Sequence, residues 1–131
     1  MDFILLINKQ GKVRLVKWYR EGIDGDKIIK ELSTLIPMRK KNMSNIYEMG
    51  GMKVIYKRFA SLYFIVGVSK DSNELIVSDM IQRYVEVMDR EYGNVCELDI
   101  VFNYQLAYNI LNELVIEGKF YEPSHNISGA L

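Results

Sequence analysis

Two runs of β-branched and aromatic residues, 52–59 (MKVIYKRF) and 61–68 (SLYFIVGV), follow one another almost without interruption. Residues of these types favour extended strands. Strands joined by so short a turn can only pair in the antiparallel direction. Gly50-Gly51 supplies turn chemistry just before the first run. The chain must therefore fold around an antiparallel hairpin, and its other segments have to cover or extend that sheet.

Three further segments are expected to add strands to this hairpin. Residues 2–9 (DFILLINK) and 12–19 (KVRLVKWY) flank Gln10-Gly11 and form an opening hairpin. Within its second strand, Arg14 alternates with Val13 and Leu15, so it faces away from them. A short strand is expected over residues 44–49.

Apolar residues recur at helical spacing in three other segments, which are residues 24–36, 74–92 and 104–117. Each of these helices is preceded by a residue that can cap it and followed by one that stops it. The caps and stops are Asp24 and Pro37, Asn73 and Gly93, and Asn103 and Gly118. The apolar segment 94–102 is compact, and its pattern leaves its type open.

The order β-β-α-β-β-β-α-α predicts a single α+β domain over residues 1–131, with a five-stranded antiparallel sheet and flanking helices. The tail, from about residue 120 to 131, contains Pro123 and Gly129 and is expected to be loosely held.

Charge and cysteine content limit the partners and the compartment. Seventeen basic residues balance seventeen acidic ones, so no overall field draws the chain to nucleic acid or to an anionic membrane. Binding to either would need a local patch or a partner subunit, and the run Arg39-Lys40-Lys41 reads more simply as a solvated loop. One cysteine cannot build a disulfide framework, which favours the cytoplasm. No apolar stretch approaches the roughly 20 residues that span a bilayer.

Residues that carry chemistry are sparse. The only histidine, His125, lies in the tail, and Cys96 stands among apolar neighbours, where a buried and inert thiol is expected. No histidines or cysteines occur at metal-ligand spacing, and Glu97 with Asp99 reads as a cap or a surface pair. We therefore expect no enzyme activity, no metal site and no cofactor. Nine tyrosines and seven methionines in a small chain favour a partner-binding surface instead.

Residues 54–64 (VIYKRFASLYF) resemble the signature of the clathrin adaptor small chains: two aliphatic residues, Tyr, a basic residue, four variable positions and Leu-Tyr-Phe. Three other segments resemble the same family at the expected distances. They are residues 11–19, 84–89 and 94–103, so the similarity covers the chain from Met1 to about Pro123.

This resemblance implies a longin-like (SNARE-like) domain, whose element order is the one already derived from the residues. It implies a sigma subunit in direct contact with a large adaptin-type chain, in a complex with a second large chain and a medium (mu) chain. Such a subunit is cytoplasmic and sits on coated vesicles of Golgi/endosomal membranes or of the plasma membrane, and it reaches the membrane through the assembled complex. Residues 60–62 and 73–76 look nearest to the trans-Golgi/endosomal type.

Sigma subunits of this family help bind acidic dileucine sorting signals, [Asp/Glu]-x-x-x-Leu-[Leu/Ile], in membrane cargo. By resemblance, Arg14 would face the acidic residue of the signal and Asn94 would form a polar rim. The apolar wall of the leucine pocket would be Ala60, Leu62, Val85, Val95 and Ile100.

Two alternatives stay open. The apolar residues of this set also fit a plain core, and the chain also fits a purely structural longin-type coat subunit, similar to coatomer zeta, without a cargo pocket. One departure from the family is expected at the C-terminus, where a further helix is absent or reduced to residues 124–131.

Overall fold

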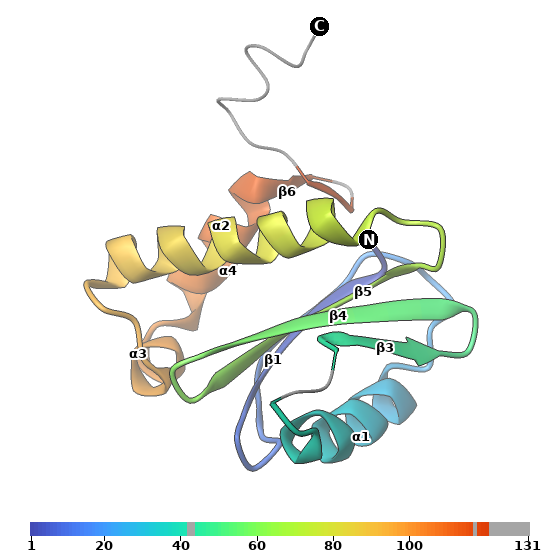
Figure 1. Ribbon diagram of the computed structural model, residues 1–131. Helices are drawn as coiled ribbons and strands as arrows, with labels where there is room; N and C mark the ends of the chain where they lie inside the picture. The colour runs from blue at the N-terminus through green and yellow to red at the C-terminus, as the bar shows by residue number, and fades with distance from the viewer. Residues whose placement is uncertain (42–43, 117, 121–131) are drawn as a thin grey trace, which may run out of the picture.

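The computed structural model describes residues 1–41, 44–116 and 118–120. At its centre lies a five-stranded antiparallel sheet in the order β2-β1-β5-β4-β3 (Figure 1). The predicted fold class and element order are thereby confirmed. The strands are β1 (Phe3–Asn8), β2 (Val13–Trp18), β3 (Ile46–Met49), β4 (Met52–Phe59) and β5 (Leu62–Ser69).

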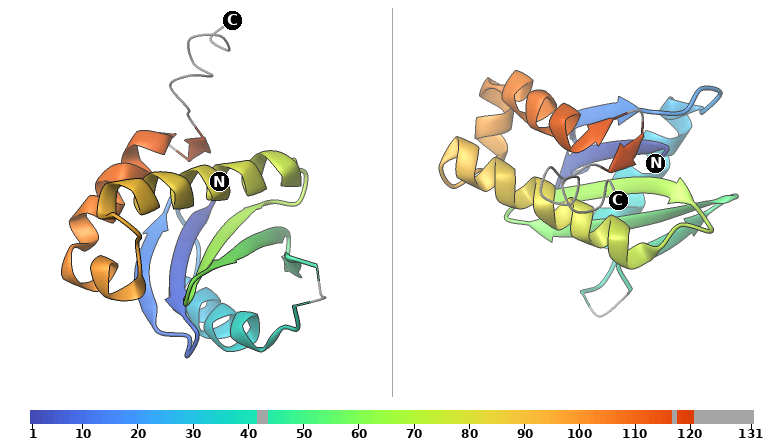
Figure 2. Two further views of the ribbon diagram at one scale, coloured as in Figure 1. Left: turned by 60° about the vertical axis from the view of Figure 1, so that its left-hand side comes forward. Right: turned by 90° about the horizontal axis from the view of Figure 1, so that it is seen from above.

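Helices cover both faces of this sheet (Figure 2). Helix α1 (Gly25–Leu35) lies on one face, while α2 (Glu74–Tyr92) and α4 (Tyr104–Leu114) lie on the other. A short helix, α3 (Glu97–Phe102), occupies the segment whose type the sequence left open. The described chain ends in a small hairpin of β6 (Val115–Ile116) and β7 (Lys119–Phe120).

One helix end differs from the prediction. The helix expected over residues 104–117 ends at Leu114, because Val115 turns into an extended conformation and pairs with Phe120 in the small hairpin. Pro37 ends the α-helix as predicted, since α1 stops at Leu35. It lies within a 3-10 turn, η1 (Ile36–Met38), where a proline near the first position costs no internal hydrogen bond.

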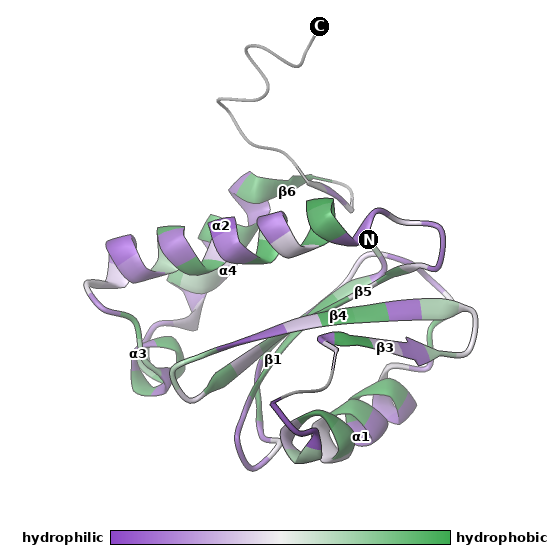
Figure 3. Ribbon diagram, in the orientation of Figure 1, coloured by the Kyte–Doolittle hydropathy of each residue, from purple (hydrophilic) through white to green (hydrophobic). Residues whose placement is uncertain are grey.

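The sheet separates two cores, which explains why β1 is apolar from Phe3 to Ile7. Phe3, Leu5 and Ile7 pack towards α1, whereas Ile4 and Leu6 pack towards α2 and α4. Hydrophobic residues are accordingly dense along the strands (Figure 3). Between α2 and α4, the buried hydroxyl of Tyr84 donates to the Ala107 carbonyl at 2.9 Å, so this polar group is satisfied inside the core.

One glycine of the sheet is required by packing. Gly67 pairs with Phe3 across β5 and β1, and a Cβ built on Gly67 would lie 2.1 Å from the Phe3 ring. The Phe3 ring is itself buried, with its centroid 5.4 Å from that of Trp18. The central strand therefore has room only for glycine at this position.

No helix in the described parts of the chain is long and apolar enough to cross a membrane. The predictions for the tail beyond residue 120 and for His125 fall outside the described residues.

Candidate functional site

One end of the sheet gathers most of the residues singled out from the sequence. Asn8, the last residue of β1, pairs with Leu62, the first residue of β5. Its side-chain amide donates to Glu97 of α3 at 2.9 Å, and its Oδ1 accepts from the backbone of Gln10 and Lys12, each at 2.9 Å. Asn8 thereby joins α3 and the β1–β2 turn at the end of the sheet where the β4–β5 turn also lies.

Arg14 is held at this end by a carboxylate of its own chain. Its Nε donates to Glu97 Oε2 at 2.6 Å, and the two side chains are only 19% and 21% exposed. The hydrogen bond from Asn8, followed by that from Arg14 and its positive charge, lowers the pKa of Glu97 below its ordinary value, against the opposing effect of burial. Arg14 thus lies near the surface, as predicted, but its charge is already matched.

The loop between α2 and α3 is fixed by Asp89. Gly93 and Asn94 both adopt positive φ, at 71° and 66°. The Asp89 carbonyl accepts from Asn94 N at 2.9 Å, and its carboxylate accepts from Val95 N at 3.0 Å. This arrangement turns Val95 into the core and leaves Asn94 exposed, in a position that suits a rim.

The prediction of a buried Cys96 is wrong. Cys96 is the extended residue before α3, and its backbone N–H donates to the Asp99 carboxylate at 2.8 Å. Because Val95 takes the inward position, Cys96 is turned to the surface and its thiol is exposed.

Four residues of the expected leucine pocket lie in a single apolar cluster. Leu62, Val85, Val95 and Ile100 come from β5, α2, the loop and α3, and none is more than 4% exposed. Ala60, at the turn between β4 and β5, is exposed and has φ of 54°. The structure therefore brings the apolar residues together as closed core. A pair of leucine side chains could reach them only after α3 or its loop moves outward.

An exposed apolar surface, which the sequence did not locate, lies next to this cluster. Leu98, Val101 and Phe102 project from α3 and Tyr104 from the start of α4, and Phe102 is 83% exposed. The many tyrosines predicted a partner-binding surface, but two of them, Tyr56 and Tyr63, are buried on the α1 face of the sheet. The spacing of residues 98, 101 and 102, opposite buried Ile100, was the available signal.

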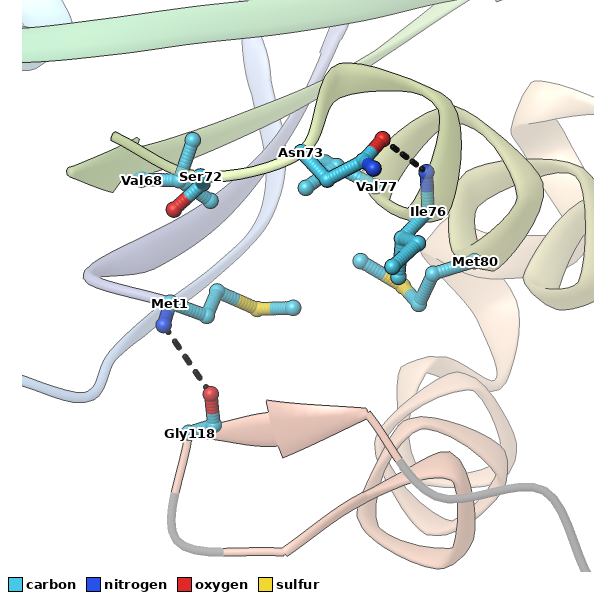
Figure 4. Close-up of a pocket in the computed structure, with 8 residues that line it drawn as sticks. All are labelled: Met1, Val68, Ser72, Asn73, Ile76, Val77, Met80 and Gly118. Carbon is cyan, nitrogen blue, oxygen red and sulfur yellow. Dashed lines mark hydrogen bonds between the residues drawn. The ribbon is translucent and has the colours of Figure 1, made fainter. Parts of the chain in front are cut away.

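A hollow lies at the other end of the sheet, between the start of α2, the end of β5 and Met1 (Figure 4). It measures about 230 Å³ and is lined mainly by apolar side chains, including Val68, Ile76 and Met80. The Met1 ammonium beside it donates to the Gly118 carbonyl at 3.0 Å. This hollow is remote from Arg14 and contains none of the predicted site residues.

Among the described residues, no three or more His, Cys, Asp or Glu side chains come together in a way that could hold a metal ion. The arrangement at the end of the sheet combines an arginine, a polar rim and an apolar cluster. Such a set suits recognition of a peptide that carries both acidic and aliphatic side chains.

Comparisons with known proteins agree with these features. A family model described as "Clathrin adaptor complex small chain" matches residues 1–127. The AP-1 complex subunit sigma-1 of Schizosaccharomyces pombe is 44% identical over 126 residues, which cover 95% of this chain and 78% of the relative. The AP-1 complex subunit sigma-1 of Saccharomyces cerevisiae is 49% identical over 128 residues, with 95% and 82% covered.

A human relative and a structure extend the comparison. The AP-1 complex subunit sigma-1A of Homo sapiens is 44% identical over 126 residues, with 95% of this chain and 80% of the relative covered. A chain of a homology model of the full-length AP-3 complex, in a stretched open conformation, superposes with a TM-score of 0.73 at 30% identity. That superposition covers 93% of this chain and 84% of the other.

Proposed function

The chain belongs to the clathrin adaptor complex small chain family, and we propose that it helps bind acidic dileucine sorting signals of membrane cargo at the end of the sheet that carries Arg14. As a small subunit of an AP-1-type adaptor complex, it takes part in vesicle-mediated protein transport and associates with other adaptor subunits. Its role is that of an adaptor and not of an enzyme.

The observation that carries the proposal is the placement of Arg14 beside the apolar cluster. Arg14 reaches Glu97, the first residue of α3, and the same short helix contributes buried Ile100 to the cluster that contains Leu62 and Val85. A signal with its acidic residue near Arg14 would therefore have its leucines close to α3. The residue types match the signal in chemistry, with a cation for its acidic residue and apolar side chains for its leucines.

The energetics favour modest affinity. Full burial of a leucine side chain contributes about 1.5–3 kcal/mol, and an ion pair at a partly exposed rim contributes about 1 kcal/mol or less. Moving α3 or its loop to admit the leucines subtracts from this sum. Several signals and contacts on one membrane would raise the effective affinity through multivalency.

The partner for this end of the molecule is proposed to be a large adaptin-type chain, within a complex that also holds a second large chain and a medium chain. The apolar surface of Leu98, Val101, Phe102 and Tyr104 supports this proposal, because an exposed patch of large apolar side chains is typical of a permanent interface. We place the assembled complex on the cytoplasmic side of Golgi or endosomal coated vesicles, in line with the AP-1 names of the relatives.

The test is a titration of the complex between this chain and a large adaptin-type chain with an acidic dileucine peptide. Val85→Asp should abolish binding, because it places a charge in the apolar cluster. Arg14→Ser should weaken binding of the acidic peptide several-fold and leave a peptide with a neutral residue at that position unchanged.

Lys9→Ser is the matched control, since Lys9 is an exposed cation next to the same β1–β2 turn and makes none of the ion pairs found among the described residues. A stable complex that ignores the peptide would refute the cargo role and leave a structural coat subunit, similar to coatomer zeta.

A further inference from the structure

A basic hollow lies on the α1 face of the sheet, next to η1 and the residues that follow it. It measures about 580 Å³, and four of its lining residues are cations: Arg39, Lys40, Lys41 and Arg58. The buried side chains of Tyr56 and Tyr63 form part of its floor. None of the described residues that line it is acidic. In a chain whose net charge is zero, this grouping is a local separation of charge.

The positive charge of the hollow is not matched by carboxylates of the described chain. The ion pairs found among the described residues join Arg14 to Glu97, Arg20 to Asp2 and Lys53 to Glu74, so none of them involves a cation of the hollow. Four cations with no carboxylate between them repel one another. A bound anion would relieve that repulsion.

Both arginines are held in place by the sheet. Arg39 Nε donates to the Tyr56 hydroxyl at 2.8 Å, and its Nη2 donates to the Ser44 carbonyl at 2.9 Å. Its guanidinium lies 5.8 Å from the centre of the Tyr56 ring, and that of Arg58 lies 5.9 Å from the centre of the Tyr63 ring. The arginines are therefore oriented before any ligand arrives, which lowers the entropic cost of binding an anion.

We propose that this hollow binds the phosphorylated headgroup of an anionic membrane lipid. Guanidinium and ammonium groups together are the usual protein ligands of phosphate. Met38, next to Arg39, is 76% exposed. An apolar side chain beside a basic cluster is typical of surfaces that lie against a bilayer, where the cations meet headgroups and the apolar group enters the interface.

The position of the hollow supports a membrane lipid over an acidic protein, and this step rests on the proposed cargo function. Arg58 Nε donates to the Ala60 carbonyl at 3.3 Å. The β4–β5 turn thus lies between the hollow on one face and the Leu62 cluster on the other face of the same sheet end. A sorting signal emerges from the bilayer, so docking it would bring this end, and with it the hollow, close to the headgroups.

Vesicle sedimentation of the complex with a large adaptin-type chain tests the proposal without any cargo peptide. The vesicles compared are neutral phosphatidylcholine, the same lipid with phosphatidylserine, and the same lipid with a phosphoinositide at equal total charge. Lys40→Gln with Lys41→Gln should weaken binding to phosphoinositide vesicles by about 25-fold, since each basic residue near an anionic surface contributes about fivefold. Arg58→Gln should weaken it by about fivefold.

Lys70→Gln with Lys119→Gln is the matched control. It removes the same charge from exposed lysines outside the hollow and should change binding far less. Met38→Ser should weaken binding to vesicles but not to the soluble inositol phosphate headgroup, which distinguishes a lipid from a free phosphate. Equal losses for the hollow and control variants would overturn the proposal, as would selective binding of acidic peptides by the hollow.

The proposed cargo function can fail independently. If the complex binds phosphoinositide vesicles through the hollow but does not bind the dileucine peptide in solution, the lipid site is supported and the cargo site is refuted. If it binds the peptide but the hollow variants bind vesicles like the wild type, the cargo site is supported and the lipid site is refuted.

Discussion

Arg14 Nε lies 2.6 Å from Oε2 of Glu97, 83 positions along the chain, and the amide of Asn8 donates to the same carboxylate oxygen. The arginine proposed to receive the acidic residue of a cargo signal therefore already holds an acidic residue of its own chain. A cargo carboxylate has to compete with Glu97 or to share Arg14 with it. Glu97 should therefore reduce the contribution of the signal's acidic residue to the binding affinity.

Glu97→Gln is expected to raise the affinity for an acidic dileucine peptide by about two- to fivefold, because it frees the charge of Arg14 and the exchanged ion pair is partly exposed. The affinity for a peptide with a neutral residue at the acidic position should not change. Calorimetric titration of the complex with both peptides measures this difference. Glu113→Gln, at an exposed glutamate of α4, is the control. Equal effects of Glu97→Gln on both peptides would contradict competition for Arg14.

The contact between Glu97 and Arg14 should also make the stability of the fold depend on pH in the acid range. The pKa of Glu97 is held below its ordinary 4.5, so the folded chain binds this proton less readily than the unfolded chain does. Its stabilising contribution is complete above pH 4.5 and is lost as the pH falls through the lower folded pKa. The difference in Tm between the wild type and Glu97→Gln should therefore narrow below that pH. A difference that stays constant into acid would show that the charge of Glu97 does not stabilise the fold.

Gly67→Ala should destabilise the central sheet by about 1–3 kcal/mol, the usual cost of overpacking a core. The new methyl group would lie 2.1 Å from the buried Phe3 ring. Gly51→Ala is the matched control, because nothing lies within 4 Å of a Cβ at Gly51, and its effect should stay within about 0.5 kcal/mol. Urea unfolding of both variants gives the comparison. Equal stabilities would mean that the ring can move aside.

Features fixed by neighbouring residues could be predicted from the sequence. The caps Asp24, Asn73 and Asn103 each accept from a backbone N–H within three positions of their own, as their residue types indicated. The hairpins and the sheet followed from strand composition and short turns. The end of α4 at Leu114 could not be predicted, because pairing between β6 and β7 decides it.

The sequence predicted which residues make up the candidate site, but not whether they form an open pocket or a closed core. The resemblance selected Leu62, Val85, Val95 and Ile100, and these residues do lie together. Whether they line an open pocket or a closed core depends on the position of α3, which no local pattern reports. The pairing of Arg14 with Glu97 could not be predicted either, since these residues are far apart in the sequence and only the folded chain brings them into contact.

Cys96 provides a probe of the site's movement. Because its thiol is exposed and it is the only cysteine of the chain, a maleimide should label the folded small chain once without denaturant. It lies between Val95 of the apolar cluster and Glu97, so a bound dileucine peptide should slow its labelling. The mass of the small chain, followed over time within the complex, measures both effects. In Val85→Asp, labelling should proceed with or without peptide at one rate. A thiol that reacts only after unfolding would contradict the exposed position of Cys96. If the peptide still slows labelling in Val85→Asp, the peptide covers Cys96 without occupying the leucine pocket.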